Sequence, residues 1–501
     1  MSSHYYQQPG FQQPNPYDPL QNNPQAYIST RPSLDSLLPK KEDRFKPSQY
    51  KDVWALVLWV TCLLAFLGFS AYSISNLVKN GEIGSSVGSV NLNASGKSNM
   101  EVQDAIGSLV LSIIVGFVVS LLYFMAMQRF TGTLITVTLY FAIAMNFVMA
   151  AFFFVAGQPI MGAIMLVLAG IVAWCMWSWR HRIPFAKVML KTVCSVTAKY
   201  PALIFVGVLG LIGQVVFLAV WVGGVVGLQD MIKRNLLSEN AGYGLYLYLI
   251  FVFYWTSQVL GNSVHITTAG VFATYFFRGV ANGNGDVDVP VSNPTVAAAK
   301  RAWTTSLGPN CYGSLLIALI QLLRFLVDQA QRESAEEGNL VSVMILCCVQ
   351  CILNLFQGLL EYFNKYAFAQ VAIYGKDYCS AAKDTWELTK ARGIDAIIND
   401  NLIGNVLGMG ALAIGLITGG VACIYVSIHP NLANEQSYYV IFGLIGLFVG
   451  ITEFSVLAGV IDSGVITTFV CLAEDPQALA QTKPDLYRKI QEVYPQVILG
   501  F

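Results

Sequence analysis

Charged side chains are scarce in this sequence. Asp, Glu, Lys and Arg together make up 12% of its 501 residues, about half of the roughly 25% found in soluble globular proteins. Hydrophobic residues account for 55% and the mean hydropathy is +0.57. A chain of this size with so few charges cannot cover itself with polar surface, so the composition predicts a polytopic membrane protein.

Several enzyme motifs are also missing. The sequence has no G-x-x-x-x-G-K-[ST], no H-E-x-x-H and no Ser/His pair placed like that of an intramembrane protease. NGNGD at 282–286 does not fit G-x-G-x-x-G and follows no predicted strand. We therefore expect no enzyme activity, no cofactor and no ATP-driven pumping. The net charge of zero gives no reason to expect a nucleic-acid partner.

Cysteines do not form a recognisable framework. All ten lie in or next to apolar segments, so we expect no disulfides. Cys347, Cys348 and Cys351 have no His or Cys pair nearby to complete a zinc site, and we expect no bound metal. We interpret these three as helix-packing residues, with acylation near a membrane face as the alternative.

Long apolar runs dominate the rest of the chain. A membrane span needs roughly 20 mostly apolar residues, and all backbone groups within lipid must be paired internally, which favours helices. The sequence therefore predicts an all-α protein. We expect about ten transmembrane helices, at 53–78, 104–127, 131–156, 159–179, 201–227, 243–277, 313–331, 341–375, 401–427 and 439–473.

Three regions follow from this pattern. Residues 1–50 are rich in Gln, Pro, Asn and Tyr without apolar periodicity, which predicts a disordered cytosolic tail that could recruit cytosolic partners. Residues 51–475 form the predicted transmembrane domain in the lipid bilayer, and 476–501 a cytosolic C-terminal tail. We expect no signal peptide, because the first apolar run starts at Val53 and is long enough to span.

The basic residues predict the orientation. With the N-terminus inside, the inner segments within about 20 residues of a span hold 21 Lys and Arg residues and the outer segments hold five, as the positive-inside rule requires. Both termini are then cytosolic. Asn93, in the sequon Asn93-Ala94-Ser95, falls in the first outer loop and is a candidate glycosylation site.

Two predicted spans, 243–277 and 341–375, are too long for a simple crossing. At 1.5 Å per residue each would reach about 50 Å, against a hydrocarbon core of roughly 30 Å. They must kink, tilt or lie partly along the membrane surface. The favoured breaks are Gly261-Asn262 and Gln357-Gly358, because Gly and amide side chains weaken the helical hydrogen-bond ladder.

Ionisable residues within the spans are the candidate functional groups, because charge in hydrocarbon is costly and usually has a role. Glu361 and Lys365 could neutralise each other as an i,i+4 pair or take part in transport. Arg324 could pair with Glu453 or Asp462 as a structural or gating charge. His265 follows the favoured break at Gly261-Asn262 and could be a packing residue, a pH-sensitive gate or a substrate contact.

Aromatic residues near these charges could bind an organic cation. A quaternary ammonium has no N–H to donate, so its site needs aromatic faces for cation–π attraction and a nearby carboxylate. Trp255, Tyr254 and Tyr366 could form such a cage, with Glu361 or Glu453 as the counter-charge. The alternative is that these rings belong to the ordinary aromatic belt or to the core.

Several segments resemble the choline transporter-like family. NKYA at 364–367, AIYG at 372–375, YCSAAKDTWEL at 378–388 and FVCLAED at 469–475 are similar to its motifs, as are GVFATYFF at 270–277 and GPNCYGSLLIALIQLLR at 308–324. The resemblance covers about residues 50–490. The Gln/Pro/Tyr-rich tail, short first outer loop and AEDPQAL ending look like the fungal, Pns-type branch.

The resemblance implies ten transmembrane helices, cytosolic termini and facilitated uptake of choline or a related amine at the cell membrane. A cation moving inward gains about 2.3 kcal/mol per 100 mV, so no coupling ion is needed. We expect alternating access, with the pathway among the fifth, sixth, eighth and tenth spans. The alternatives are a transporter of ethanolamine or another amine, and a membrane scaffold that does not transport.

Overall fold

The computed structural model describes residues 45, 49–79, 102–179, 183–282, 287–392, 395–429 and 436–493. This part of the chain is helical apart from one short antiparallel hairpin, in which β1 (Val280–Ala281) pairs with β2 (Val287–Asp288). The predicted all-α membrane fold is confirmed. Asn93 lies outside the described residues, as do 1–44 and 46–48 of the predicted tail.

Ten apolar helices correspond to the ten predicted spans. Nine of them, in the described part of the chain, are long and apolar enough to cross a membrane, and α7 contributes a shorter apolar stretch. Helix ends extend past several predicted limits because hydrogen bonding continues beyond the apolar region. The helices are α3 (Val53–Lys79), α5 (Val102–Arg129), α6 (Thr131–Val155), α7 (Pro159–Trp179), α9 (Ala202–Lys233), α10 (Glu239–Arg278), α12 (Leu307–Glu336), α13 (Leu340–Tyr374), α15 (Asp395–Ile428) and α17 (Gln436–Glu474).

The predicted spans 243–277 and 341–375 are not broken where the sequence suggested. Helix α10 continues through Gly261-Asn262 and α13 continues through Gln357-Gly358, so these predicted breaks are wrong. The amide side chains bond to other side chains instead of disturbing their own backbone ladder. Asn262 donates from Nδ2 to Ser314 Oγ of α12 at 3.0 Å, and Gln357 donates to Glu361. The part of α10 and α13 that exceeds one membrane crossing is therefore not accommodated by a break at these positions.

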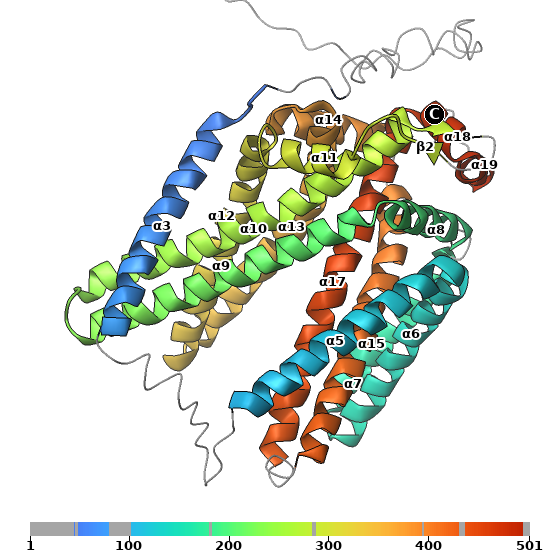
Figure 1. The fold of residues 1–501 in the computed structure, drawn as a ribbon. Coiled ribbons are helices and arrows are strands. Elements are labelled where there is room, and N and C mark those ends of the chain that lie inside the picture. Colours follow the sequence, from blue (N-terminus) through green and yellow to red (C-terminus); the bar gives the residue numbers. More distant parts are fainter. Residues whose placement is uncertain are drawn as a thin grey trace, which may run out of the picture. The chain divides into compact units, whose positions relative to one another are not determined.

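The spans form two groups, which Figure 1 shows on its left and right. The first group contains α3, α9, α10, α12 and α13, and the second contains α5, α6, α7, α15 and α17. The most extensive helix pair in the described structure is α15 with α17. Helix α17 also makes the main contacts to the first group, through α9, α10 and α13. It therefore connects the two groups.

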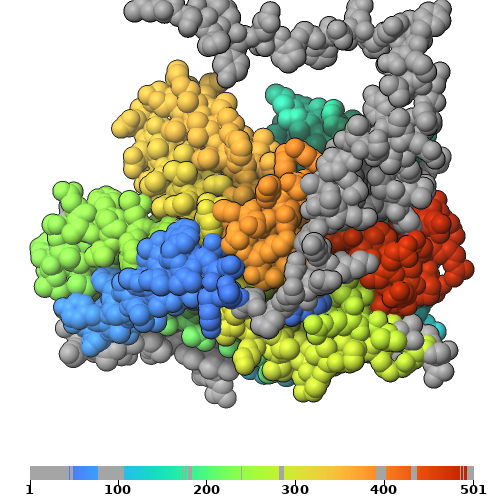
Figure 2. All heavy atoms as spheres, turned by 90° about the horizontal axis from the view of Figure 1, so that it is seen from above, coloured from blue at the N-terminus to red at the C-terminus, as the bar shows by residue number. Residues whose placement is uncertain are grey.

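Short helices gather at one end of the spans, the upper end in Figure 1, which we name the capped end. The segments around α11 and α14 and the C-terminal helices form much of its described surface (Figure 2). Residues 476–493, predicted as a tail, form two of these helices. The capping helices are α8 (Ile183–Lys199), α11 (Pro294–Ala302), α14 (Tyr378–Arg392), α18 (Pro476–Thr482) and α19 (Pro484–Val493).

The chain just before α3 is attached to this end. Phe45, within the predicted disordered tail, donates its backbone N–H to the Ile373 carbonyl at 3.1 Å. Its ring centroid lies 4.8 Å from the guanidinium carbon of Arg278 and 5.2 Å from that of Arg301. Asp52 accepts at Oδ2 from the first backbone N–H of α14 at 2.8 Å. The described residues before α3 are thus bound to α10, α11, α13 and α14.

Burial is uneven along the helices that meet between the groups. Residues 265–276 of α10, 366–374 of α13 and 463–472 of α17 are all buried near the capped end. In contrast, no residue between 340 and 360 of α13 is buried. Cys347, Cys348 and Cys351 are exposed on this part of α13, so their interpretation as packing residues is wrong. Burial of α13 is therefore confined to its part near the capped end, and we name the opposite end of the spans the open end.

Candidate functional site

An ion pair joins the two helix groups where the closely packed region ends. Lys365 Nζ of α13 lies 2.7 Å from Asp462 Oδ2 of α17. Lys365 is nine residues before the end of α13, hence about 14 Å from the capped end along the helix axis. Charges at this position are tolerable because they are paired. The predicted pair of Glu361 with Lys365 is therefore wrong in this conformation.

Both charged side chains of this pair remain partly accessible. The exposed fraction is 43% for the Lys365 side chain and 25% for the Asp462 side chain. Residues 366–374 and 463–472, which follow them toward the capped end, are buried. The pair therefore lies where the continuous burial of α13 and α17 near the capped end gives way to partial exposure.

His265 of α10 links the same three helices. Its Nε2 lies 2.8 Å from the Lys365 carbonyl oxygen and its Nδ1 lies 2.8 Å from Ser463 Oγ. A carbonyl only accepts, so Nε2 must carry a proton. The Ser463 hydroxyl can donate to Nδ1, or donate to the Gly459 carbonyl at 2.7 Å and accept from Nδ1. Both the neutral and the doubly protonated imidazole of His265 can therefore form these two hydrogen bonds.

Buried asparagines hold α12 against its neighbours. Asn310 is fully buried and donates from Nδ2 to the Val259 carbonyl at 3.0 Å and to Ser263 Oγ at 2.9 Å, both on α10. Asn364 of α13 donates to the Gly313 carbonyl of α12 at 3.0 Å. Asn310 was not among the candidate functional residues predicted from the sequence, although it lies in the GPNCYGS segment.

Tyr378 fixes the start of α14 to the same network. Its hydroxyl donates to Asn364 Oδ1. Burial, with Cys379 and Tyr312 nearby, raises the pKa of Tyr378, so its hydroxyl keeps the proton that it donates. The position of α14 at the capped end is therefore coupled to α13, one residue before Lys365.

A buried carboxylate fastens α13 to α17 at the capped end itself. Glu474 is 8% exposed and accepts from Gln370 Nε2 at 2.5 Å and from the Tyr374 hydroxyl at 2.6 Å. Glu474 was not among the residues predicted to be functional. The signal was present in the sequence, because Glu474 lies near the end of the FVCLAED segment, immediately after an apolar span.

Arg324 does not pair with either carboxylate suggested by the sequence. It donates from Nη1 to Gln357 Oε1, and Gln357 Nε2 donates in turn to Glu361 Oε1 at 2.6 Å. The predicted pairing of Arg324 with Glu453 or Asp462 is wrong, because the α12–α13 contact places a glutamine beside the guanidinium. Glu361 lies on α13 one turn farther from the capped end than Lys365.

Glu453 belongs to a different environment. It lies on α17 and faces Gly116 of α5 and Thr418 of α15, within the second helix group. Its Oε2 atom is buried without a hydrogen-bond partner among the described residues. The two carboxylates predicted as counter-charges, Glu361 and Glu453, are therefore not brought together.

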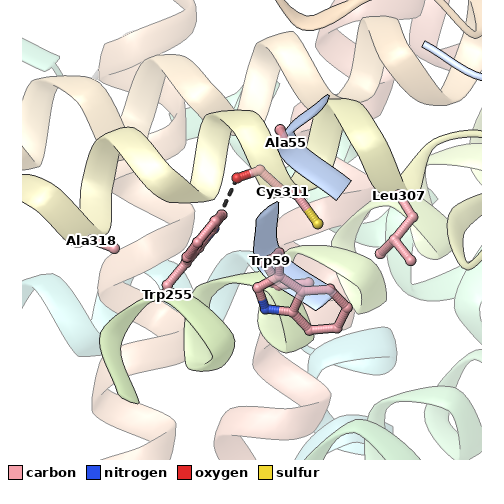
Figure 3. Close-up of a cluster of buried hydrophobic side chains, with 7 residues drawn as sticks. Ala55, Trp59, Trp255, Leu307, Cys311 and Ala318 are labelled. Atoms are coloured by element: carbon pink, nitrogen blue, oxygen red, sulfur yellow. Dashed lines mark hydrogen bonds between the residues drawn. The ribbon is translucent and has the colours of Figure 1, made fainter. Parts of the chain in front are cut away.

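The three aromatic residues predicted to form a cation cage do not lie together either. Trp255 is fully buried among α3, α10 and α12 and donates from Nε1 to the Cys311 carbonyl at 3.0 Å (Figure 3). It precedes His265 by ten residues, about 15 Å along α10. Tyr254 is half-buried beside Phe253. In this conformation the Trp255 ring faces packed side chains.

Tyr366 is the cage candidate that lies close to the ion pair. It follows Lys365 directly and is 7% exposed. The Tyr362 hydroxyl donates to the Tyr366 hydroxyl at 2.8 Å, and the two ring centroids are 4.9 Å apart. These two tyrosines provide aromatic faces one turn from the paired charges.

Comparisons with known proteins give a consistent result. A family profile described as "Plasma-membrane choline transporter" matches residues 163–477. "Protein PNS1" of Mycosarcoma maydis is 34% identical over 503 residues, covering 97% of this chain and 91% of the relative. "Protein PNS1" of Cryptococcus neoformans is 32% identical over 475 residues, covering 92% and 85%. A CTL-like protein of Dictyostelium discoideum is 31% identical over 466 residues, covering 90% and 77%.

Proposed function

Because the chain belongs to the choline transporter-like family, we propose that it carries choline or a related organic cation across the plasma membrane by facilitated transport. The observation that carries this proposal is the partly exposed ion pair of Lys365 and Asp462 within the spans. Ionisable groups within membrane spans are costly and commonly mark the pathway of a substrate or ion, and the partial exposure of this pair makes it reachable by a solute.

The packing supports alternating access. The ion pair lies between a closely packed end and an end where α13 carries no buried residue. Transport requires the reverse arrangement as well, in which the capped end separates and the open end closes. Helix α17 is positioned to change its contacts with α10 and α13, since it connects the two groups.

The charge distribution supports a cytosolic capped end. This end includes the basic residues around α8, α11 and α14, which the positive-inside rule assigns to the cytosol. The present conformation is then closed to the cytosol and accessible from outside. Inward movement of a cation is favoured by about 2.3 kcal/mol for each 100 mV of inside-negative potential.

Choline uptake into vesicles tests the proposal. The purified full-length chain is reconstituted into liposomes, and labelled choline is added with and without an inside-negative potential set by a potassium gradient and valinomycin. We expect uptake above empty vesicles that rises severalfold with the potential, because roughly each 59 mV multiplies the equilibrium ratio of a monovalent cation by about ten. Competition by unlabelled ethanolamine distinguishes a choline carrier from a general amine carrier. No uptake of either amine above empty vesicles would refute the proposal.

A substitution at His265 tests whether the ion-pair region takes part in transport. Phenylalanine retains a planar ring but removes the bonds to Ser463 and to the Lys365 carbonyl. We expect uptake to fall by about tenfold, since one positioning contact contributes on the order of 1–2 kcal/mol. Size-exclusion profiles should stay unchanged. Uptake equal to that of the wild type would show that His265 only packs.

A further inference from the structure

We propose that Asp462 is the carboxylate that binds the transported cation, that the Lys365 ammonium occupies this place when the site is empty, and that Lys365 moves to Glu361 when the cation binds. The inference rests on the proposed function and assigns residues to it. Its basis is that the Lys365 ammonium pairs with a carboxylate on the neighbouring helix, while a second carboxylate, Glu361, lies four residues before it on its own helix.

Asp462 has the features that a cation site in a membrane requires. Its side chain is 25% exposed although Val460 and Ile461 before it and residues 463–472 after it are buried, so the carboxylate is accessible at a point where α17 is otherwise packed. Its present partner is an ammonium 2.7 Å away, which shows that the space between α13 and α17 accepts a positive charge. The neighbouring residue, Ser463, connects this position to His265 of α10.

A facilitated carrier must also return empty. An ionised carboxylate without a partner is costly to carry through a water-poor protein interior and through the membrane field. With Lys365 paired to Asp462, the empty site has no net charge from these two groups, and the return step needs no other cation. We therefore expect the empty carrier to need Lys365 for its return across the membrane. When a substrate cation is bound, that cation neutralises Asp462 and Lys365 is not needed for this purpose.

Glu361 offers the displaced ammonium a second partner. It precedes Lys365 by four residues, so the two side chains lie on the same face of α13 with their Cβ atoms about 5–6 Å apart. Within the described residues Glu361 forms no ion pair and accepts a hydrogen bond from Gln357 at 2.6 Å. The lysine side chain is flexible enough to turn from one carboxylate to the other.

The neighbouring aromatics fit an organic cation. A quaternary ammonium cannot hydrogen-bond to Asp462, so it needs charge together with aromatic faces. Tyr362 and Tyr366 lie on α13 within one turn of Lys365, with their hydroxyls joined to each other. Turning Lys365 toward Glu361 would leave the position beside Asp462 to the substrate.

Comparing net uptake with exchange tests the role of Lys365. Net uptake of labelled choline into empty vesicles needs the return of the empty carrier, whereas exchange against unlabelled choline inside the vesicles does not. For Lys365→Met we expect net uptake to fall at least about tenfold with exchange within about twofold of the wild type. Lys365→Arg should retain net uptake. As matched control, Lys376→Met removes the lysine of an ion pair outside the spans and should leave the ratio unchanged.

Two further variants distinguish the roles of the two carboxylates, Asp462 and Glu361. Asp462→Asn should lose both uptake and exchange, and choline should not raise its melting temperature as we expect it to do for the wild type. Glu361→Gln keeps the Lys365–Asp462 pair and should instead weaken choline binding by about tenfold, because displaced Lys365 loses its alternative partner. This variant tests the proposal even if Lys365→Met does not fold.

The outcomes distinguish this inference from the proposed function. Wild-type protein that neither takes up nor exchanges choline or ethanolamine overturns both. Active wild-type protein combined with equal losses of uptake and exchange in folded Lys365→Met overturns the inference alone. Unchanged choline affinity in Glu361→Gln, or full exchange by Asp462→Asn, also overturns it.

Discussion

Leucine in place of Gly419 is expected to prevent assembly of the second helix group. A Cβ atom at Gly419 would lie 2.8 Å from the Gly443 carbonyl oxygen and 3.3 Å from Leu447 Cβ, both on α17. The carbonyl belongs to the backbone and cannot rotate away without breaking its own helix. Overpacking in a core costs about 1–3 kcal/mol when side chains can adjust, and here a backbone must move, so we expect the cost to exceed this range.

The neighbouring glycine provides the control. Gly420 is exposed, and a Cβ atom there would meet nothing within 4 Å. Gly420→Leu has the same chemistry at the next residue of α15 and should behave like the wild type. Fluorescence-detected size exclusion of a tagged chain provides the measurement, with Gly419→Leu eluting as aggregate. A monodisperse Gly419→Leu with wild-type melting temperature would show that α15 and α17 do not pack in this way.

Removing the Glu474 carboxylate is expected to weaken the capped end strongly. Glu474→Ala eliminates the acceptor for both Gln370 and Tyr374, which join α13 to α17. Hydrogen bonds to a charged group contribute about 1.5–3 kcal/mol each, so for two of them we expect a loss of about 3 kcal/mol or more. The melting temperature in detergent should fall by several degrees.

Glutamine in place of Glu474 tests whether the negative charge or only the hydrogen bonds of this side chain are required. Gln370 Oε1 is buried without a partner among the described residues. In Glu474→Gln the new amide would retain an acceptor for Tyr374, and Gln370 could flip its own amide so that Oε1 accepts from the new NH₂ group. We therefore expect a melting temperature close to that of the wild type. Equal destabilisation by alanine and glutamine would mean that the negative charge itself is required.

The capped-end contacts bear on the proposed alternating access. In that proposal, opening of the capped end would separate α13 from α17 and break the bonds of Glu474. The ion pair of Lys365 and Asp462 joins the same two helices nearer the open end. Both contacts would therefore have to change if α13 and α17 separate along their length.

The membrane spans could be predicted from sequence because hydropathy is a local and additive property. The ten apolar segments became ten helices, and their limits changed mainly where a helix continued into polar residues, as at Lys233 and Glu336. The basic residues predicted an orientation by the same kind of local count. The breaks predicted at Gly261-Asn262 and Gln357-Gly358 were wrong because a helix break was treated as a property of the local sequence. In the structure the Asn262 and Gln357 amides bond to other side chains, and the helices continue.

The amino-acid sequence was enough to predict the number, approximate position and composition of the membrane spans, together with the short set of ionisable residues within them. The partners of those residues depend on the three-dimensional packing of the spans. Lys365 pairs with Asp462, 97 residues later in the chain, and not with Glu361 one turn away. The physical reason is that a span's stability in lipid depends on its own side chains, while an ion pair depends on distances between helices. Those distances are set by packing, such as the close approach of α15 and α17 at their glycines.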